Sequence, residues 1–158
     1  MPDPPEPRTD PDVDLRVPAD RRELAVHPLA VLVAIAAGGV LGALARAGLQ
    51  HAAPHPPTGF PWATFTVNLS GCLLIGVLMA VLGHRGGGHP LARPFLGVGV
   101  LGGFTTFSTY AVDIQQAVVA GAPGTAATYL AATVFGALAA VAAGDAAAAG
   151  LLRRRAAR

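Results

Sequence analysis

The chain has 158 residues, of which 53% are hydrophobic and only 13% are charged, and its formal net charge is +2. From residue 24 to the end, Asp113 and Asp145 are the only acids. A soluble domain needs charged side chains on every surface element, so this composition excludes one and predicts a single-domain, all-α membrane protein. Cys72 is the only cysteine, which excludes an intrachain disulfide.

Residues 1–27 form an acidic, proline-rich stretch without apolar periodicity, which predicts a disordered tail. The apolar run after it is too long for a signal peptide and lacks a convincing cleavage site. We therefore divide the chain into this tail, a membrane domain over residues 28–153 and a short basic tail over residues 154–158.

Four apolar segments follow, at about residues 29–49, 62–82, 93–120 and 125–152, and each is close to the ~20 residues with which a helix crosses a bilayer. The connectors between them are short and rich in proline and glycine, which favours turns. Trp62 begins the second segment, at a position typical of an interfacial anchor. The pattern predicts four transmembrane helices.

The 11 basic charges are all arginines, and their distribution predicts the orientation of the chain. With four spans, the N-terminus, the middle connector and the C-terminus lie on the same side of the membrane. That side holds Arg8, Arg16, Arg21, Arg22, Arg85, Arg93, Arg153, Arg154, Arg155 and Arg158. Because positively charged loops remain in the cytoplasm, we expect both termini there, in a protein of the plasma membrane.

The first span contains a row of small residues that ends in a cation. Gly38, Gly42 and Arg46 recur every four residues and share one helix face. The glycines allow close helix contact, in which case Arg46 simply reaches toward the interface. Alternatively, Arg46 attracts an anion at a pore mouth, since a membrane arginine costs about 2.5–3.5 kcal/mol on insertion scales and requires compensation.

The second and fourth spans each carry a pair of polar residues four positions apart. Thr64 and Asn68 form the first pair, and Tyr129 and Thr133 form the second. An amide at that depth needs a hydrogen-bond partner, so Asn68 either joins two helices or donates its N–H groups to an anion. The hydroxyls of the fourth span either extend a polar track or join neighbouring helices.

The third span contains the stretch GVGVLGGFTTFSTY at residues 97–110, which is unsuited to a plain membrane helix. Lipid offers no partner for the backbone groups and hydroxyls of this stretch, so a break there must be enclosed by protein or line an ion path. We expect Gly99, Gly102 and Gly103 to let the backbone unwind in mid-membrane and approach a neighbouring segment. Carbonyls near Gly102 and Thr105 then bind a small cation.

The residues after this break favour a polar track. Phe107 and Tyr110 are three positions apart, and the positive edges of their rings can face an anion, although such spacing also serves plain packing. Hydroxyls on Thr106, Ser108 and Thr109 lie beside them.

The sequence offers little support for enzymatic chemistry. It contains no Ser-His-Asp or Cys-His set, no carboxylate pair and no phosphate-binding loop with a lysine, so an enzyme is not expected. His51 and His55 have the spacing of a helical metal pair, but the prolines around His55 prevent the helix that such a pair requires.

Three stretches, GGVLGALAR at 38–46, ATFTVNLSG at 63–71 and GGFTTFSTY at 102–110, resemble in order the signature stretches of the fluoride ion channel (Fluc/CrcB) family. The resemblance extends over about residues 29–152. It implies an antiparallel, dual-topology dimer of four-helix subunits with two pores, in which fluoride leaves the cytoplasm passively. It also implies a structural sodium ion at the dimer centre, bound by the backbone carbonyls of Gly102 and Thr105.

The same resemblance implies roles for individual side chains. Asn68 donates to fluoride, Phe107 and Tyr110 edge the ion path, and Arg46 lies near a vestibule. The polar track contains or adjoins Thr64, Ser108, Thr109, Tyr129 and Thr133. Tyr110 departs from the family pattern, which usually has phenylalanine there, and Ala47 stands where an aromatic residue is common.

The sequence leaves several alternatives open. The partner in the dimer is a second copy or a homologous subunit of opposite orientation, and the one-sided arginines favour a fixed orientation. A small four-helix cation antiporter would need a membrane-embedded carboxylate in the first span, where none exists. A structural membrane subunit without a pore would leave Asn68, Arg46 and the hydroxyl cluster without a purpose.

Overall fold

The computed structural model describes residues 28–84 and 89–156, and within these ranges every regular element is a helix. The elements are α2 (Pro28–Ala52), α3 (Trp62–His84), η1 (Arg93–Leu101), α4 (Gly102–Phe104), α5 (Phe107–Val119) and α6 (Pro123–Ala156). The four expected spans are therefore confirmed, with η1, α4 and α5 together forming the third. The expected N-terminal tail, Arg85 and the last two residues lie outside the described ranges.

Proline and glycine explain where several helices begin and end. α2 ends at Ala52, two residues before Pro54, and α3 begins directly after Pro61. Gly121 has φ 78°, a left-handed conformation that suits glycine, and it ends the turn after α5. Pro123 then occupies the first position of α6, where its missing N–H costs no helical hydrogen bond.

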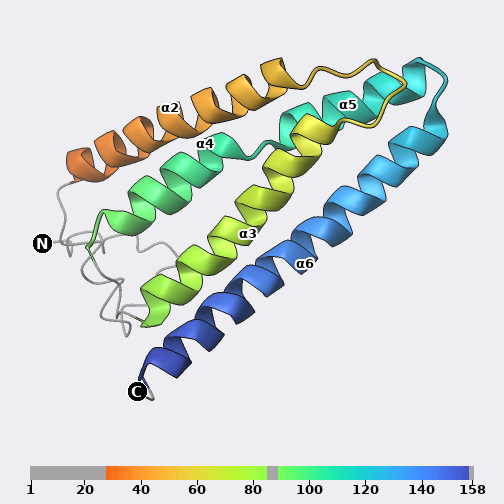
Figure 1. The fold of residues 1–158 in the computed structure, drawn as a ribbon. Helices are drawn as coiled ribbons and strands as arrows, with labels where there is room; N and C mark the ends of the chain where they lie inside the picture. The colour runs from red at the N-terminus through yellow and green to blue at the C-terminus, as the bar shows by residue number, and fades with distance from the viewer. Residues whose placement is uncertain (1–27, 85–88, 157–158) are drawn as a thin grey trace, which may run out of the picture.

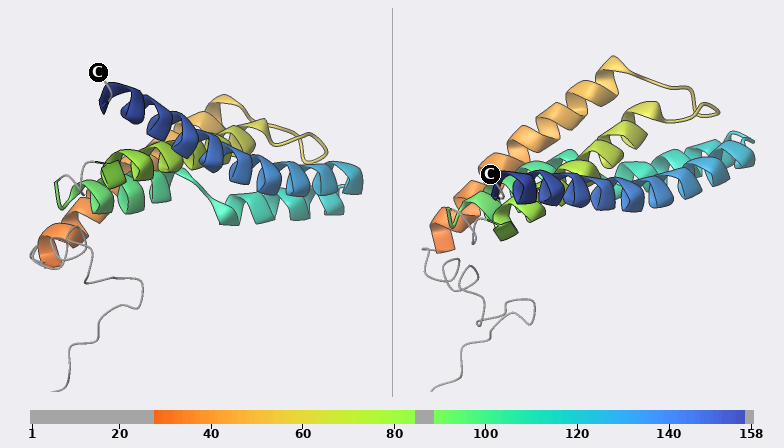
Figure 2. Two further views of the ribbon diagram at one scale, coloured as in Figure 1. Left: turned by 90° about the horizontal axis from the view of Figure 1, so that it is seen from below. Right: turned by 60° about the horizontal axis from the view of Figure 1, so that its bottom comes forward.

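The four spans lie side by side in an elongated bundle (Figures 1 and 2). α2 and the third span run in one direction and α3 and α6 in the other, so the start of α2 and the end of α6 lie at the same end (Figure 1). The most extensive packing joins α3 to α6. The third span changes neighbour along its length, because η1 and α4 pack on α2 whereas α5 packs on α6.

Glycines allow these helices to approach backbone to backbone. A Cβ atom built on Gly42 of α2 would lie 2.0 Å from the carbonyl oxygen of Val100, and one on Gly38 would lie 2.3 Å from that of Phe95. In the other pair, a Cβ on Gly76 would lie 2.2 Å from the carbonyl oxygen of Val141. The small residues of the first span therefore form a packing seam, as expected.

The outer surface is apolar. Leu32, Leu44 and Leu138 are among the many large hydrophobic side chains that stay more than half exposed. All four spans are long and apolar enough to cross a membrane. Length, composition and outward-facing side chains are those of a multi-pass membrane protein.

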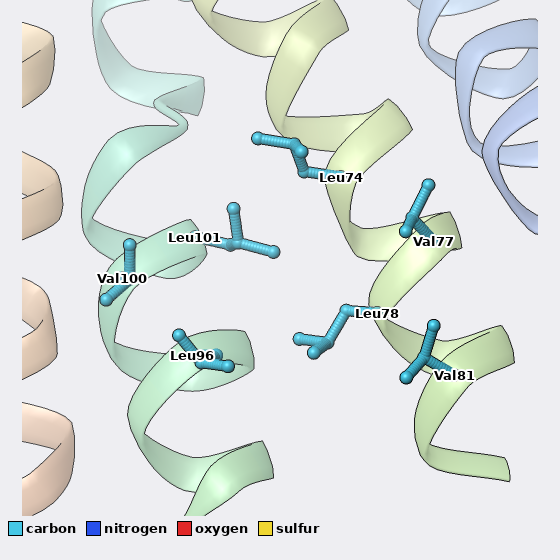
Figure 3. Close-up of a pocket in the computed structure, with 7 residues that line it drawn as sticks. All are labelled: Leu74, Val77, Leu78, Val81, Leu96, Val100 and Leu101. Atoms are coloured by element: carbon cyan, nitrogen blue, oxygen red, sulfur yellow. The ribbon is translucent and has the colours of Figure 1, made fainter. Parts of the chain in front are cut away.

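An apolar groove of about 360 Å³ lies between α3 and η1 (Figure 3). Only aliphatic side chains line it, namely Leu74, Val77, Leu78, Val81, Leu96, Val100 and Leu101. These side chains provide no hydrogen-bond donor for an anion. The polar residues singled out from the sequence lie elsewhere.

Candidate ion-binding site

The third span is interrupted at Thr105 and Thr106. Thr105 has φ −77° and ψ 159°, and Thr106 has φ −149° and ψ 125°, so both are extended between two helices. The stretched link between α4 and α5 is visible in Figure 2 (left). Two consecutive non-helical residues leave backbone groups without their usual helical partners.

The two extended residues do not lie at the glycines themselves, although Gly99 belongs to η1, a π-helix whose turns are wider than those of an α-helix. Gly102 and Gly103 are helical, and the backbone leaves the helix two residues later. A Cβ on Gly103 would lie 2.4 Å from the carbonyl oxygen of Gly39, and one on Gly99 would lie 2.8 Å from that of Ile35. These two glycines therefore permit the expected close approach to a neighbour, which is α2. Polar side chains stabilise the interruption that follows.

Asn68 of α3 binds the interruption with both ends of its amide. Its Nδ2 donates to the carbonyl oxygen of Thr106 at 3.0 Å, and its Oδ1 accepts from the backbone N–H of Thr106 at 2.9 Å. Asn68 is only 8% exposed, so both bonds form away from the surface. Since the amide nitrogen has two hydrogens, one N–H remains to donate to a further group.

Thr106 also caps α5. Its hydroxyl accepts from the backbone N–H of Thr109 at 3.1 Å and donates to the Thr109 hydroxyl at 3.1 Å. The hydroxyl of Ser108 lies 3.2 Å from that of Thr106. Three hydroxyls thus gather at the N-terminus of α5, where the helix dipole favours negative charge.

Carbonyl groups point from the other side of the interruption. Because the N–H of Thr106 bonds to Asn68, it does not serve the carbonyl of Gly102, its usual helical partner. The carbonyl of Gly103 accepts from Nε of Arg46 at 3.2 Å. Arg46 therefore contacts the third span directly rather than only reaching toward the interface.

Four aromatic rings continue from the interruption along α5 and α6 to Phe60 in the connector before α3. The centroids of Phe107 and Tyr110 are 5.8 Å apart, those of Tyr110 and Tyr129 are 5.2 Å apart, and those of Tyr129 and Phe60 are 5.3 Å apart. Phe107 is 80% exposed in the single chain, whereas Tyr110 is buried. The Tyr110 hydroxyl, which phenylalanine would lack, donates to the carbonyl of Leu130 at 3.0 Å.

Asp113 joins this group, although the sequence reasoning gave it no role. It is buried, and the Tyr129 hydroxyl donates to its Oδ2 over a long 3.5 Å hydrogen bond. Nε2 of His55 lies 3.8 Å from its Oδ1. The available signal was a lone acid in an apolar span, one turn after Tyr110, because such residues are usually functional.

The remaining candidates lie in the interior of the bundle. Thr64 is buried and accepts from Nε2 of Gln50 at 3.4 Å. Thr133 is buried, and among the described residues its hydroxyl is the buried side-chain polar atom without a hydrogen-bond partner. An unpaired buried hydroxyl is uncommon and marks a place where a ligand or water can bind.

The structure thus brings the sequence candidates into two clusters. Asn68, Ser108, Thr109 and Arg46 surround the interruption, while Tyr110 and Tyr129 meet on α5 and α6 together with Asp113. Within the described ranges, no group of three or more His, Cys, Asp or Glu side chains is placed to hold a metal ion.

Taken together, these features define a class of protein. Four apolar spans surround an interrupted helix and buried polar side chains such as Asn68, Thr106 and Thr133, which is the construction of a small membrane protein with polar groups in its interior. Residues 33–145 match the family model described as CrcB-like protein, Camphor Resistance (CrcB), and the chain belongs to this family.

Relatives with a stated activity agree with this assignment. The chain is 57% identical over 128 residues to "Fluoride-specific ion channel FluC 2" of Thermobifida fusca, covering 81% of this chain and 95% of that protein. It is 53% identical over 131 residues to "Fluoride-specific ion channel FluC 2" of Streptomyces avermitilis, covering 82% of each. "Fluoride-specific ion channel FluC" of Paracoccus denitrificans is 47% identical over 110 residues, covering 70% of this chain and 87% of that protein.

Proposed function

We propose that this protein is a fluoride-specific channel through which fluoride leaves the cytoplasm passively. The observation that carries the proposal is the interruption at Thr105 and Thr106, bound by the Asn68 amide in a chain whose relatives are named fluoride channels. Fluoride is small and strongly hydrated, so a pore must replace its water with fixed donors. Amide, hydroxyl and ring-edge groups do so without trapping the ion on a full positive charge.

Residues along the path have distinct roles in this proposal. Asn68 donates its remaining N–H to fluoride, and Ser108 and Thr109 supply hydroxyls at the positive end of α5. Phe107 and Tyr110 present ring edges, and Arg46 attracts the anion toward the vestibule. Farther along, the hydroxyls of Thr64, Tyr129 and Thr133 continue the track.

The proposal includes a structural sodium ion, held by backbone oxygen atoms near the interruption. Hard cations prefer oxygen ligands, and the carbonyl of Gly102 has lost the N–H of Thr106 to Asn68. The carbonyls of Gly102 and Thr105 would supply two ligands per chain. When bound, the ion would neutralise these carbonyl dipoles and join two subunits at the centre of an antiparallel dimer.

A second subunit also accounts for Phe107. An aromatic side chain that is 80% exposed, directly after a polar interruption, is well placed to edge a path between two chains. The partner is a second copy or a homologous subunit in the opposite orientation. The cation-antiporter alternative remains disfavoured, because α2 contains no carboxylate.

Liposome efflux with the Asn68→Asp variant tests the proposal. Purified protein in vesicles loaded with fluoride or chloride should release fluoride rapidly and chloride slowly. A carboxylate at position 68 has no N–H to donate and places negative charge beside the carbonyl of Thr106, so we expect fluoride efflux to fall by at least about tenfold, the loss of roughly one charge-assisted hydrogen bond.

Ser70→Ala is the matched control, because the Ser70 hydroxyl is exposed and bonds only within its own helix. It should conduct as the unaltered protein does. Equal efflux of fluoride and chloride, or unchanged fluoride efflux in Asn68→Asp, would contradict the proposed function.

A further inference from the structure

The connector between α2 and α3 also contacts α5 and α6. The Thr125 hydroxyl of α6 donates to the carbonyl of Thr58 at 3.2 Å. The ring of Phe60 packs edge to face on Tyr129 at an interplanar angle of 80°. His55 approaches Asp113 of α5. This short segment therefore touches both members of the Tyr129–Asp113 pair.

Asp113 needs a partner because a buried carboxylate without one is costly. Its side chain is 8% exposed, and within the described ranges its ion-pair partner is His55, whose side chain is 22% exposed. The other titratable groups that face the pair are Tyr129, which bonds to Asp113, and Tyr110, whose ring packs on Tyr129. His51, at the end of α2, is exposed.

The two nitrogens of the His55 ring face two groups that can only accept. Nδ1 lies 3.1 Å from the carbonyl oxygen of Pro56, and Nε2 lies 3.8 Å from Oδ1 of Asp113. A neutral imidazole carries one N–H, so either tautomer leaves a lone pair directed at one of these oxygens. Only the doubly protonated ring directs an N–H toward both.

We propose that His55 is a positioning residue of the ion path that acts through Asp113. Protonated His55 holds the carboxylate and offsets its charge beside the Tyr129 hydroxyl, so that an anion passes this point more readily. When His55 loses its proton, the ring no longer offsets the charge of Asp113, and that charge opposes the anion. The inference rests on the proposed fluoride path and makes conduction depend on pH at the end of the protein that carries this connector.

Fluoride efflux between pH 8 and pH 6 tests the inference, because histidine changes its charge in this range. Efflux should rise by about two- to fivefold toward pH 6, the range supported by an ion pair at a partly exposed site. His55→Gln should lose this rise, and His55→Arg, which stays charged, should conduct at the higher level at both pH values. Vesicles without protein measure the leak of hydrogen fluoride at each pH.

His51→Gln is the matched control and should keep the rise, since His51 lies at the same end but is exposed. A second readout does not depend on conduction. The melting temperature of the unaltered protein should exceed that of His55→Gln by a larger margin at pH 6 than at pH 8. If fluoride efflux is absent but the pH-dependent thermal difference is observed, only the proposed function is contradicted. A flat pH profile, or a thermal difference that does not change with pH, overturns the role of His55.

Discussion

Asn68 and Thr133 differ in how their hydrogen-bonding groups are satisfied. Asn68 uses its Oδ1 and one N–H in hydrogen bonds to Thr106, and these bonds stabilise the interruption of the third span. Thr133 has no protein partner among the described residues although it is buried. A buried polar group without a protein partner is a candidate for contact with the ion.

Thr133→Val should separate stability from conduction. Valine has the shape of threonine without the unpaired hydroxyl, so the free energy of unfolding in detergent should stay the same or rise by up to about 1 kcal/mol. Fluoride efflux should fall by roughly tenfold if the hydroxyl donates to the ion.

Thr66→Val is the control for this variant, because the Thr66 hydroxyl is bonded to carbonyls of its own helix and is directed outward. It should leave fluoride efflux unchanged. A Thr133→Val protein that is less stable and conducts normally would show that the hydroxyl is purely structural.

Among the elements, the close packing of α2 on η1 depends on glycine, which has no side chain. Their backbones meet where Gly38, Gly42 and Gly99 leave no room for a Cβ atom, and the interruption begins just beyond this contact. The apolar groove in Figure 3 lies on the other side of η1, against α3, where the contact is made by branched aliphatic side chains.

Gly42→Ala should therefore weaken the whole bundle. The added methyl group would lie 2.0 Å from the carbonyl oxygen of Val100, so the helices must separate, at a cost of about 1–3 kcal/mol in the free energy of unfolding. The measurement is denaturant unfolding in micelles, followed by circular dichroism.

Gly48→Ala, in the same helix, has nothing within 4 Å of its new methyl group. Because alanine favours the helix by up to about 1 kcal/mol over glycine, this control should be neutral or slightly stabilising. A Gly42→Ala protein as stable as Gly48→Ala would contradict the close contact between α2 and η1.

The sequence predicts the elements better than the contacts between them. The length of the apolar segments and the positions of the prolines are sufficient to predict four spans. The four-residue spacing of the glycines is sufficient to indicate that α2 can pack closely on a neighbour. The predicted close approach to a neighbour is present at Gly99 and Gly103, whereas the two extended residues, Thr105 and Thr106, begin two positions after Gly103. The Asn68–Thr106 bonds join residues 38 positions apart, and no local pattern reports such a partner.

At the scale of the whole molecule, Arg93, Arg153 and Arg154 lie at the ends of spans, whereas Arg46 lies within α2 and contacts Gly103. Arg153 and Arg154 end α6 at the same end of the bundle at which α2 begins (Figure 1). The connectors at residues 53–61 and 120–122 contain no arginine or lysine. This asymmetry favours a single orientation in the membrane with cytoplasmic termini.

A C-terminal tag tests the orientation. In right-side-out and inverted cell-membrane vesicles, the tag should react with an impermeant reagent only from the cytoplasmic face. The control is a variant with arginines added to the connector at residues 120–122, which should shift part of the population to the opposite orientation. An even division of the unaltered protein between both faces contradicts a fixed orientation and favours an antiparallel pair of identical chains.

The two extended residues at 105–106 also set the reach of the third span. An extended residue advances about 3.3 Å along the chain, whereas a helical residue advances about 1.5 Å. If these two residues became helical, the span would therefore shorten by about 4 Å. The same change would rotate α5 about the helix axis and so disturb its packing on α6. A single amide on a neighbouring helix therefore fixes both the length of this segment and the direction in which its second half faces.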